Sequence, residues 1–332
     1  MKKCRTNRSS GVGGQAVIEG VMMRHKDTYA VAVRKPDGEI EVETEEFEGV
    51  LHHSKLKSIP FIRGVFNFLD SMILGMKTLT FSSTFYIEEE EKETKADKFF
   101  QKLFKENAQN VLMGITMVIS ILMAIAIFMV LPYFLSSLFE KYVRNNSLLA
   151  ILEGVIRIVI FVVYIVAISA MKDIRRVYQY HGAEHKCINC IEKGRPLTVK
   201  NVMRSSKQHK RCGTSFMLFV MLVSIILFFF IRVENPALRV VVRIALIPVI
   251  AGISYEIIRL AGKSNNIFVR IISAPGMWLQ RLTTKEPDEG MVEVAIASVE
   301  AVFDWKAYLK ESFGYEVDAS WMDDAEASTG EA

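Results

Sequence analysis

Residues 111–131 read VLMGITMVISILMAIAIFMVL and decide the fold of this chain. The run contains no charged side chain, and about 18 or more apolar residues in succession are typical of a helix that crosses a bilayer. Three similar runs follow at residues 149–170, 216–231 and 244–258. We therefore predict an α-helical integral membrane protein with about four transmembrane helices, two within residues 111–170 and two within residues 216–260.

The charges between these runs predict the orientation of the chain. Residues 171–215 contain 11 Lys and Arg residues, whereas the loop between the first two runs contains only Lys141 and Arg144. Because cytoplasmic loops carry an excess of positive charge, we expect a multi-pass protein of the cytoplasmic (inner) membrane with both termini in the cytoplasm. A net charge of +4 gives no support for nucleic-acid binding. Membrane lipids are the expected partners, and the oligomeric state is left open.

Residues 1–58 are predicted to form a small cytoplasmic region that contains β-structure. Residues 29–34 and 39–45 alternate apolar and polar side chains, and the turn Lys-Pro-Asp-Gly lies between them at 35–38. This pattern is typical of a β-hairpin with one solvent-facing side. The preceding segment, residues 13–24, has too many glycines for a plain strand and lacks the spacing of a phosphate-binding loop, so composition alone does not explain it.

Residues 59–110 begin with an apolar segment that carries one narrow polar face, formed by Arg63, Asn67, Asp70 and Lys77. This stripe fits a helix in the membrane interface or beneath the bundle, and it fits an amphipathic helix of a soluble domain equally well. Residues 88–105 mix charges of both signs and predict a solvated helix or linker.

Residues 261–332 are predicted to form a C-terminal cytoplasmic region. Residues 275–282 have the character of an interfacial segment with an aromatic side chain at the headgroup level. A helix is expected from Pro287 to Phe303, and the small, acidic residues 323–332 are expected to be disordered.

Residues 180–192, YHGAEHKCINCIE, carry the chemistry within the His- and Cys-rich cytoplasmic loop predicted at 171–215. They contain the pattern H-x-x-E-H. On a helix, His181 and His185 lie one turn apart on the same face, so both imidazoles can bind one divalent cation. Glu184 lies beside them, where it can polarise a metal-bound water as a general base. Downstream, His209 and Cys212 offer further donors.

Two other interpretations of this segment stay open. Cys187 and Cys190, taken with His209 and Cys212, have the spacing of a structural zinc knuckle. Alternatively, no metal is bound, since a basic loop at a membrane surface suits anionic lipid headgroups and needs no ion to explain its histidines and cysteines.

Several motifs resemble those of a known family. They are GGQAVIEGVMMR at 13–24, PFIRG at 60–64, YHGAEHK at 180–186, RCGTSF at 211–216, GISYE at 252–256 and WLQRLTT at 278–284. Over roughly residues 10–303 the chain resembles the YqhQ-like bacterial membrane proteins, a family of unknown function that has been labelled a predicted metal-dependent enzyme.

The resemblance implies a set of site residues: His181, Glu184, His185, Asn189, Glu192, His209, Arg211 and Cys212. The family pattern does not depend on a cysteine at the position of Cys187 or at that of Cys190, so the resemblance favours the histidine and glutamate site over the knuckle. It also suggests that the N-terminal motif folds back on the His-rich segment. In that case Glu19, with Gln15, would complete or brace the site.

These features favour a membrane-embedded metal-dependent enzyme, a hydrolase that acts on a membrane-associated substrate at the cytoplasmic face. We expect a divalent metal, zinc before others, with Glu184 as the catalytic residue. The expected ligands come from His181, His185, Glu192, His209 and Cys212, with support from Gln15, Glu19, Asn189, Cys190 and Arg211. The alternative is a non-enzymatic scaffold, transporter or adaptor with a structural metal or none. An adaptor would bind its partner through the N-terminal hairpin and the C-terminal helix. Deletion of residues 1–58 would then abolish partner binding and leave metal content unchanged.

Overall fold

The computed structural model describes residues 9–50, 58–86, 108–231, 233, 235–263 and 266–314. The linker predicted at 88–105 and the acidic end at 323–332 lie outside the described residues. The chain divides into two compact units. The first takes in residues 1–86, 166–220 and 248–332, and the second takes in residues 87–165 and 221–247.

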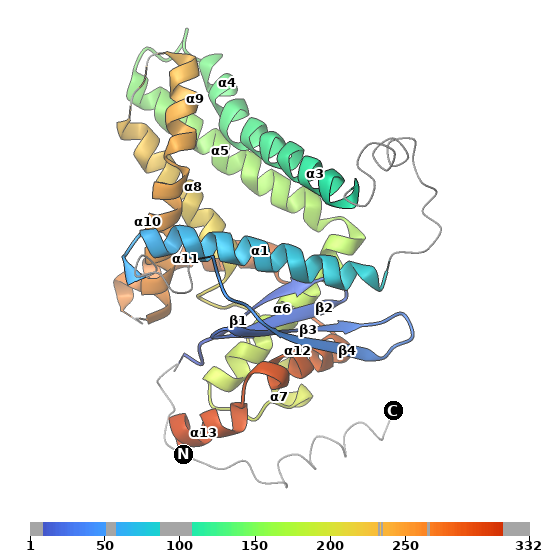
Figure 1. Cartoon of the computed structure of the whole chain (residues 1–332). Coiled ribbons are helices and arrows are strands. Elements are labelled where there is room, and N and C mark those ends of the chain that lie inside the picture. Colours follow the sequence, from blue (N-terminus) through green and yellow to red (C-terminus); the bar gives the residue numbers. More distant parts are fainter. Residues whose placement is uncertain are drawn as a thin grey trace. The chain divides into compact units, whose positions relative to one another are not determined.

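The first unit contains a four-stranded antiparallel sheet in the order β1-β2-β3-β4 (Figure 1). Its strands are β1 (Val12–Val17), β2 (Gly20–His25), β3 (Thr28–Arg34) and β4 (Ile40–Glu46). The hairpin predicted from the Lys-Pro-Asp-Gly turn is therefore confirmed as β3 and β4. The glycine-rich segment that composition did not explain forms β1 and β2, which pair along their whole length.

Helices cover both faces of this sheet. Helix α1 (Ile62–Thr84) lies on one face, where Leu74 packs with Val31 and Val33 of β3. Helices α6 (Lys172–Glu192) and α12 (Glu289–Val302) cover the other face. On that side β3 presents Ala30 and Ala32, and the Ser298 hydroxyl of α12 donates to the Ala30 carbonyl oxygen at 3.0 Å.

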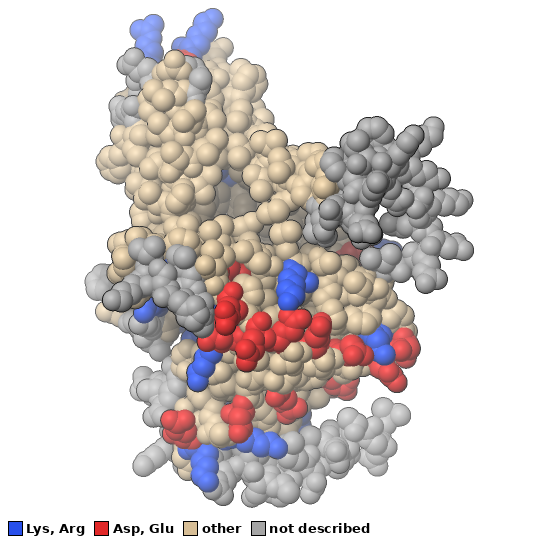
Figure 2. All heavy atoms as spheres, viewed as in Figure 1, with Lys and Arg blue, Asp and Glu red and all other residues tan. Residues whose placement is uncertain are grey.

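The prediction of one solvent-facing side holds only for the outer strand of the hairpin. Strand β3 is buried on both faces because a helix packs against each one. Strand β4 is largely exposed, and Figure 2 shows carboxylates gathered over this part of the unit. Charged side chains on an edge strand hinder unwanted pairing with another sheet.

Within the described residues, four helical segments are long and apolar enough to cross a membrane, at Gly114–Ser137, Ser147–Ser169, Gly213–Phe230 and Leu238–Gly262. They correspond to the four predicted runs. The first contains α3 (Ala108–Ile125), a π-helical turn η3 (Ala126–Val130) and α4 (Leu131–Ser137). The next two are α5 (Asn146–Ser169) and α8 (Gly213–Phe230), and the last contains α9 (Pro236–Ala245) and α10 (Ile247–Lys263).

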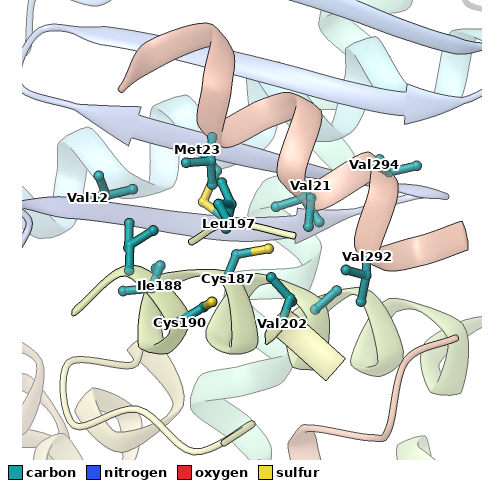
Figure 3. Packing of buried hydrophobic residues seen from close by; sticks show 14 of the residues in the cluster. Val12, Val21, Met23, Cys187, Ile188, Cys190, Leu197, Val202, Val292 and Val294 are labelled. Atoms are coloured by element: carbon teal, nitrogen blue, oxygen red, sulfur yellow. The ribbon is translucent and has the colours of Figure 1, made fainter. Parts of the chain in front are cut away.

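The segment predicted as a cytoplasmic loop at 171–215 is largely helical, since α6 and α7 (Val199–Met203) lie within it. Helix α11 (Ile267–Thr283) follows the last apolar segment and contains the predicted interfacial residues. The predicted C-terminal helix is α12, and α13 (Trp305–Phe313) follows it. Side chains from β1, β2, α6, α7 and α12 form one apolar core, shown in part in Figure 3.

Candidate metal centre

Helix α6 places two imidazoles on consecutive turns. His185 is buried, at 1% exposure, and His181 is partly buried. The centroids of their rings lie 4.4 Å apart. The twelve residues from Tyr180 to Glu192, apart from His181, are buried because this half of α6 runs between the sheet and other segments of the first unit. The helical spacing predicted for the pair is therefore present.

Backbone carbonyls orient both rings. Nδ1 of His181 lies 2.9 Å from the Thr283 carbonyl oxygen, and Nδ1 of His185 lies 2.7 Å from that of Lys207. A carbonyl oxygen can only accept, so Nδ1 carries the proton in both rings. The lone pair of each neutral imidazole is then on Nε2, which is the arrangement found for histidine ligands of metals.

Cys212 completes a set of three donors. Its Sγ lies 3.2 Å from Nε2 of His181, and it accepts a hydrogen bond from the Thr214 amide at 3.4 Å. One ligand atom from each of His181, His185 and Cys212 lies within 4.8 Å of the others. The 3.2 Å between Sγ of Cys212 and Nε2 of His181 is compatible with both atoms binding one ion at the usual distances of about 2.1 Å from nitrogen and about 2.3 Å from sulfur.

The acid–base chemistry of the three donors suits a cation. Burial disfavours a charged Cys212, but the imidazoles of His181 and His185 outweigh it and hold the pKa of the thiol well below its ordinary value. Burial also opposes a charged His181, yet the Cys212 sulfur raises the pKa of this imidazole to about 9. Cys212 is thus a thiolate, the form in which cysteine binds metals. The same pair gives His181 a proton on Nε2, which a bound cation would displace.

Glu184 lies beside the three donors. Its side chain is 6% exposed, and Oε2 lies 3.8 Å from Nε2 of His181. Within the described part of the chain, its carboxylate makes no hydrogen bond. Strand β1 passes close to it at Gly14, where an added Cβ would lie 2.9 Å from Cγ of Glu184. The absence of a side chain at Gly14 lets the strand approach the site.

Glu192, His209 and Arg211 form a second cluster next to the donors. The buried Glu192 carboxylate pairs with Arg211, lies 3.4 Å from Nε2 of His209, and accepts from the Ser10 amide at 2.8 Å. Burial opposes its charge, but His209 and Arg211 lower the pKa of Glu192 to about 2. The His185 and His209 ring centroids are 5.8 Å apart. Glu192 and His209, both predicted ligands, thus have partners other than a shared ion.

The supporting residues take several places. Asn189 donates to the carbonyl oxygens of Ser206 and Gln208, at 2.6 and 2.9 Å, and so holds the segment that leads to Cys212. Glu19 pairs with Arg176 and accepts at 3.3 Å from the hydroxyl of Tyr180, the residue directly before His181.

Gln15 lies elsewhere. An added Cβ on Gly75 of α1 would lie 2.7 Å from its Oε1, so Gln15 contacts α1 on the other side of the sheet from the donors.

Cys187 and Cys190 do not join the donor set. Both are fully buried in the apolar core (Figure 3). Burial raises the pKa of Cys187 well above its ordinary value and that of Cys190 to about 12. The Cys190 thiol donates to the Pro196 carbonyl oxygen at 3.4 Å. The four residues of the proposed knuckle are therefore not gathered around one point.

Two residues of α11, Gln280 and Thr283, form hydrogen bonds with His209 and His181. The Gln280 side chain accepts from the His209 amide at 2.9 Å and donates to the His209 carbonyl oxygen at 2.8 Å. Thr283 supplies the carbonyl that orients His181. The site residues inferred from the sequence omit both. The motif WLQRLTT at 278–284 contains them, and it was the signal that could have identified them.

The fold and this site define a mostly helical protein with four apolar helices, an N-terminal sheet and a buried histidine–cysteine cluster. The chain belongs to the family described as "Protein of unknown function (DUF1385)", whose model matches residues 59–305. It is also similar to "Uncharacterized protein YqhQ" of Bacillus subtilis (strain 168), at 38% identity over 299 residues. That match covers 86% of this chain and 90% of the relative.

The resemblance inferred from the motifs is thus confirmed. No solved structure matches the chain.

Proposed function

We propose that the protein is a membrane-embedded metal-dependent enzyme, a hydrolase, with a zinc ion held by His181, His185 and Cys212. One observation carries this proposal. Two imidazoles, each fixed through Nδ1 to a backbone carbonyl, turn toward the same cysteine sulfur. Catalytic zinc sites have three protein ligands of this kind and keep a fourth position open, whereas structural sites use four.

Each nearby side chain has a role in this proposal. A bound ion would polarise the substrate and lower the pKa of a bound water. Glu184 takes the proton from the attacking water, for which its carboxylate is available because it makes no hydrogen bond within the described residues. Glu192, His209 and Arg211 position the segment that carries Cys212, and Asn189 holds the same segment from α6.

The location of the substrate follows from the apolar helices. Two of the four segments suitable for crossing a membrane are continuous in sequence with elements of the site, since α6 follows α5 and Cys212 directly precedes α8. The 11 positive residues at 171–215 support a cytoplasmic location for this segment and for both termini. We therefore propose a substrate that is itself membrane-associated.

Metal analysis by mass spectrometry tests the proposal. The protein is purified in detergent through a tag that does not bind metal. Wild type is expected to hold nearly one zinc per chain, and His185→Ala and Cys212→Ser are expected to lose it. Cys190→Ala is the matched control, because this cysteine is buried away from the donors. Metal loss in Cys190→Ala alone, or no metal in wild type, would contradict the proposal.

Glu184→Gln separates binding from catalysis. We expect this variant to keep its zinc, since Glu184 is not one of the three clustered donors, and to lose hydrolytic activity by about 100-fold or more. Loss of zinc in Glu184→Gln would instead make Glu184 a ligand.

A second candidate, an anion transporter, is favoured by a specific observation in the second unit. Glu153, Arg157 and Arg243 are each at most 8% exposed and lie in apolar helices. The Glu153 carboxylate pairs with Arg157 at 2.8 Å and with Arg243 at 2.7 Å. One carboxylate for two guanidinium groups leaves one excess positive charge, and buried charges in membrane helices mark ion pathways.

Anion flux from proteoliposomes tests this candidate. Flux that exceeds the leak of empty liposomes, and that falls in Arg157→Met, would support transport. Arg157 is chosen because its Nε lacks a hydrogen-bond partner in the described structure, although it is buried. Flux equal to that of empty liposomes would exclude the candidate.

A further inference from the structure

A cavity of about 340 Å³ lies along one face of α11. Five residues of this helix line it: Ser273, Ala274, Met277, Trp278 and Arg281. Their spacing along the helix places them on a single face. The opposite wall comes from Gln208 and Lys210, which flank His209 in the segment that leads to Cys212. The Gln208 amide donates to the Met277 carbonyl oxygen at 3.1 Å and joins the two walls.

Helix α11 has the character of a helix that lies in a membrane interface. It follows directly after the last apolar segment, which ends at Gly262. Its side chains Ile267, Ile271 and Trp278 are 57%, 64% and 54% exposed, whereas Leu279 and Gln280 are buried. Amphipathic helices with exposed Ile and Trp side chains lie at the boundary of headgroups and acyl chains. The cavity opens beside this exposed face.

The charge of the cavity is positive. Among the described residues that line it, Lys210 and Arg281 are charged and none is a carboxylate. Other arginines of the same unit are engaged, since Arg176 pairs with Glu19 and Arg211 with Glu192. In the parts of the chain that the structure describes, the Arg281 guanidinium makes no ion pair or hydrogen bond. Its donors, and the indole N–H of Trp278, are therefore available to a ligand.

We propose that this cavity binds the phosphate group of an anionic phospholipid of the surrounding bilayer. The planar Arg281 guanidinium presents paired donors that match a phosphate. Lys210 adds a second positive charge, and the indole of Trp278 occupies the headgroup level. The acyl chains run along the exposed Ile271 face. This site does not depend on the metal centre, although the same two segments contribute to both.

Calorimetric titration tests the site on the full chain in a non-ionic detergent and phosphate-free buffer. The ligands are dioctanoyl phosphatidylglycerol, dioctanoyl phosphatidylcholine and inorganic phosphate. We expect phosphatidylglycerol to bind at least about tenfold more tightly than either of the others. Arg281→Gln should weaken its binding by about tenfold, the usual effect of losing a charge-assisted hydrogen bond. Lys210→Gln should weaken binding in the same direction.

Arg175→Gln is the matched control. Arg175 is exposed near the start of α6 and does not line the cavity, so binding should stay unchanged. Since Arg281 has no partner to lose among the described residues, its variant should keep the wild-type melting temperature. If phosphatidylcholine bound as tightly as phosphatidylglycerol, recognition of an anionic headgroup would be wrong. If inorganic phosphate bound as tightly as phosphatidylglycerol, the proposal that the ligand is a lipid would be wrong. If Arg175→Gln weakened phosphatidylglycerol binding as much as Arg281→Gln, binding would depend on general surface charge and not on this cavity.

Discussion

At the scale of single residues, the partners of His181 and Cys212 favour the histidine site over the cysteine knuckle, which the sequence spacing alone had not separated. Cys187 and Cys190 have as good a spacing for zinc as the histidines do, yet both lie in the apolar core. His181 is oriented by the Thr283 carbonyl, 102 positions away in the chain. Sequence spacing could predict that His181 and His185 share a face. It could not predict which side chains the sheet and α12 would bury.

Replacing Glu192 should test the buried cluster beside the donors. Glu192→Gln removes the carboxylate charge that faces Arg211 and His209, with Glu192 itself 0% exposed. Breaking a buried ion pair on one side costs about 3 kcal/mol or more of the free energy of unfolding. Glu293→Gln is the control, because its pair with Arg34 is solvent-exposed and worth under about 1 kcal/mol. Denaturation in detergent measures both.

The contribution of Glu192 should also depend on pH. The folded protein lowers the pKa of Glu192 to about 2, against about 4.3 in an unfolded chain. A depressed pKa contributes stability that is fully present above the unfolded value and is lost as pH falls through the folded value. The stability difference between wild type and Glu192→Gln should therefore persist down to about pH 4.3 and disappear toward pH 2. A difference independent of pH would show that the carboxylate charge does not matter.

At the scale of elements, the long apolar runs and the hairpin of β3 and β4 were predictable, whereas the glycine-rich strands β1 and β2 were not. The four apolar helices follow from composition alone, since few other structures accept such runs. Strands β1 and β2 were missed because glycines interrupt the alternation of their side chains. The structure explains Gly14: β1 approaches Glu184 of α6 so closely that a side chain would not fit there. Such a long-range contact leaves no signal in the local sequence.

Helix α6 should also be sensitive to an added side chain at Gly182, where it packs against the segment after α11. An added Cβ on Gly182 would lie 2.0 Å from the Lys285 carbonyl oxygen, and backbone cannot move aside as a flexible side chain can. We expect Gly182→Ala to lower stability by about 2 kcal/mol through overpacking. It should also reduce zinc content, because the displaced Lys285 lies two residues after Thr283, whose carbonyl orients His181.

Gly13→Ala provides the comparison for Gly182→Ala. An added Cβ on Gly13 meets nothing within 4 Å, so zinc content and melting temperature should match those of wild type. Equal zinc in Gly182→Ala and wild type would mean that the anchor on His181 is dispensable.

At the scale of the whole molecule, the first unit is assembled from three separate stretches of chain. From the sequence we predicted these stretches as three separate regions: an N-terminal region, a His-rich loop and a C-terminal region. Such a division follows from composition, which changes at the apolar runs. The contacts that unite the stretches are long-range and leave no local pattern: Ser10 reaches Glu192, and Ser298 reaches Ala30. Residues 9–50, the part of the predicted N-terminal region that the structure describes, therefore pack into the first unit together with α6 and α12.

This arrangement changes what deletion of the N-terminal region should do. An adaptor with an independent N-terminal module would keep its metal when residues 1–58 are removed. In the structure, β1 and β2 supply Val12, Val21 and Met23 to the core that buries α6. Removing residues 1–50 should expose that core and reduce zinc toward zero, because metal binding is coupled to folding of its site. Removing residues 315–332, which follow α13, should leave zinc unchanged. Full zinc content after the N-terminal deletion would show that α6 holds its donors without the sheet.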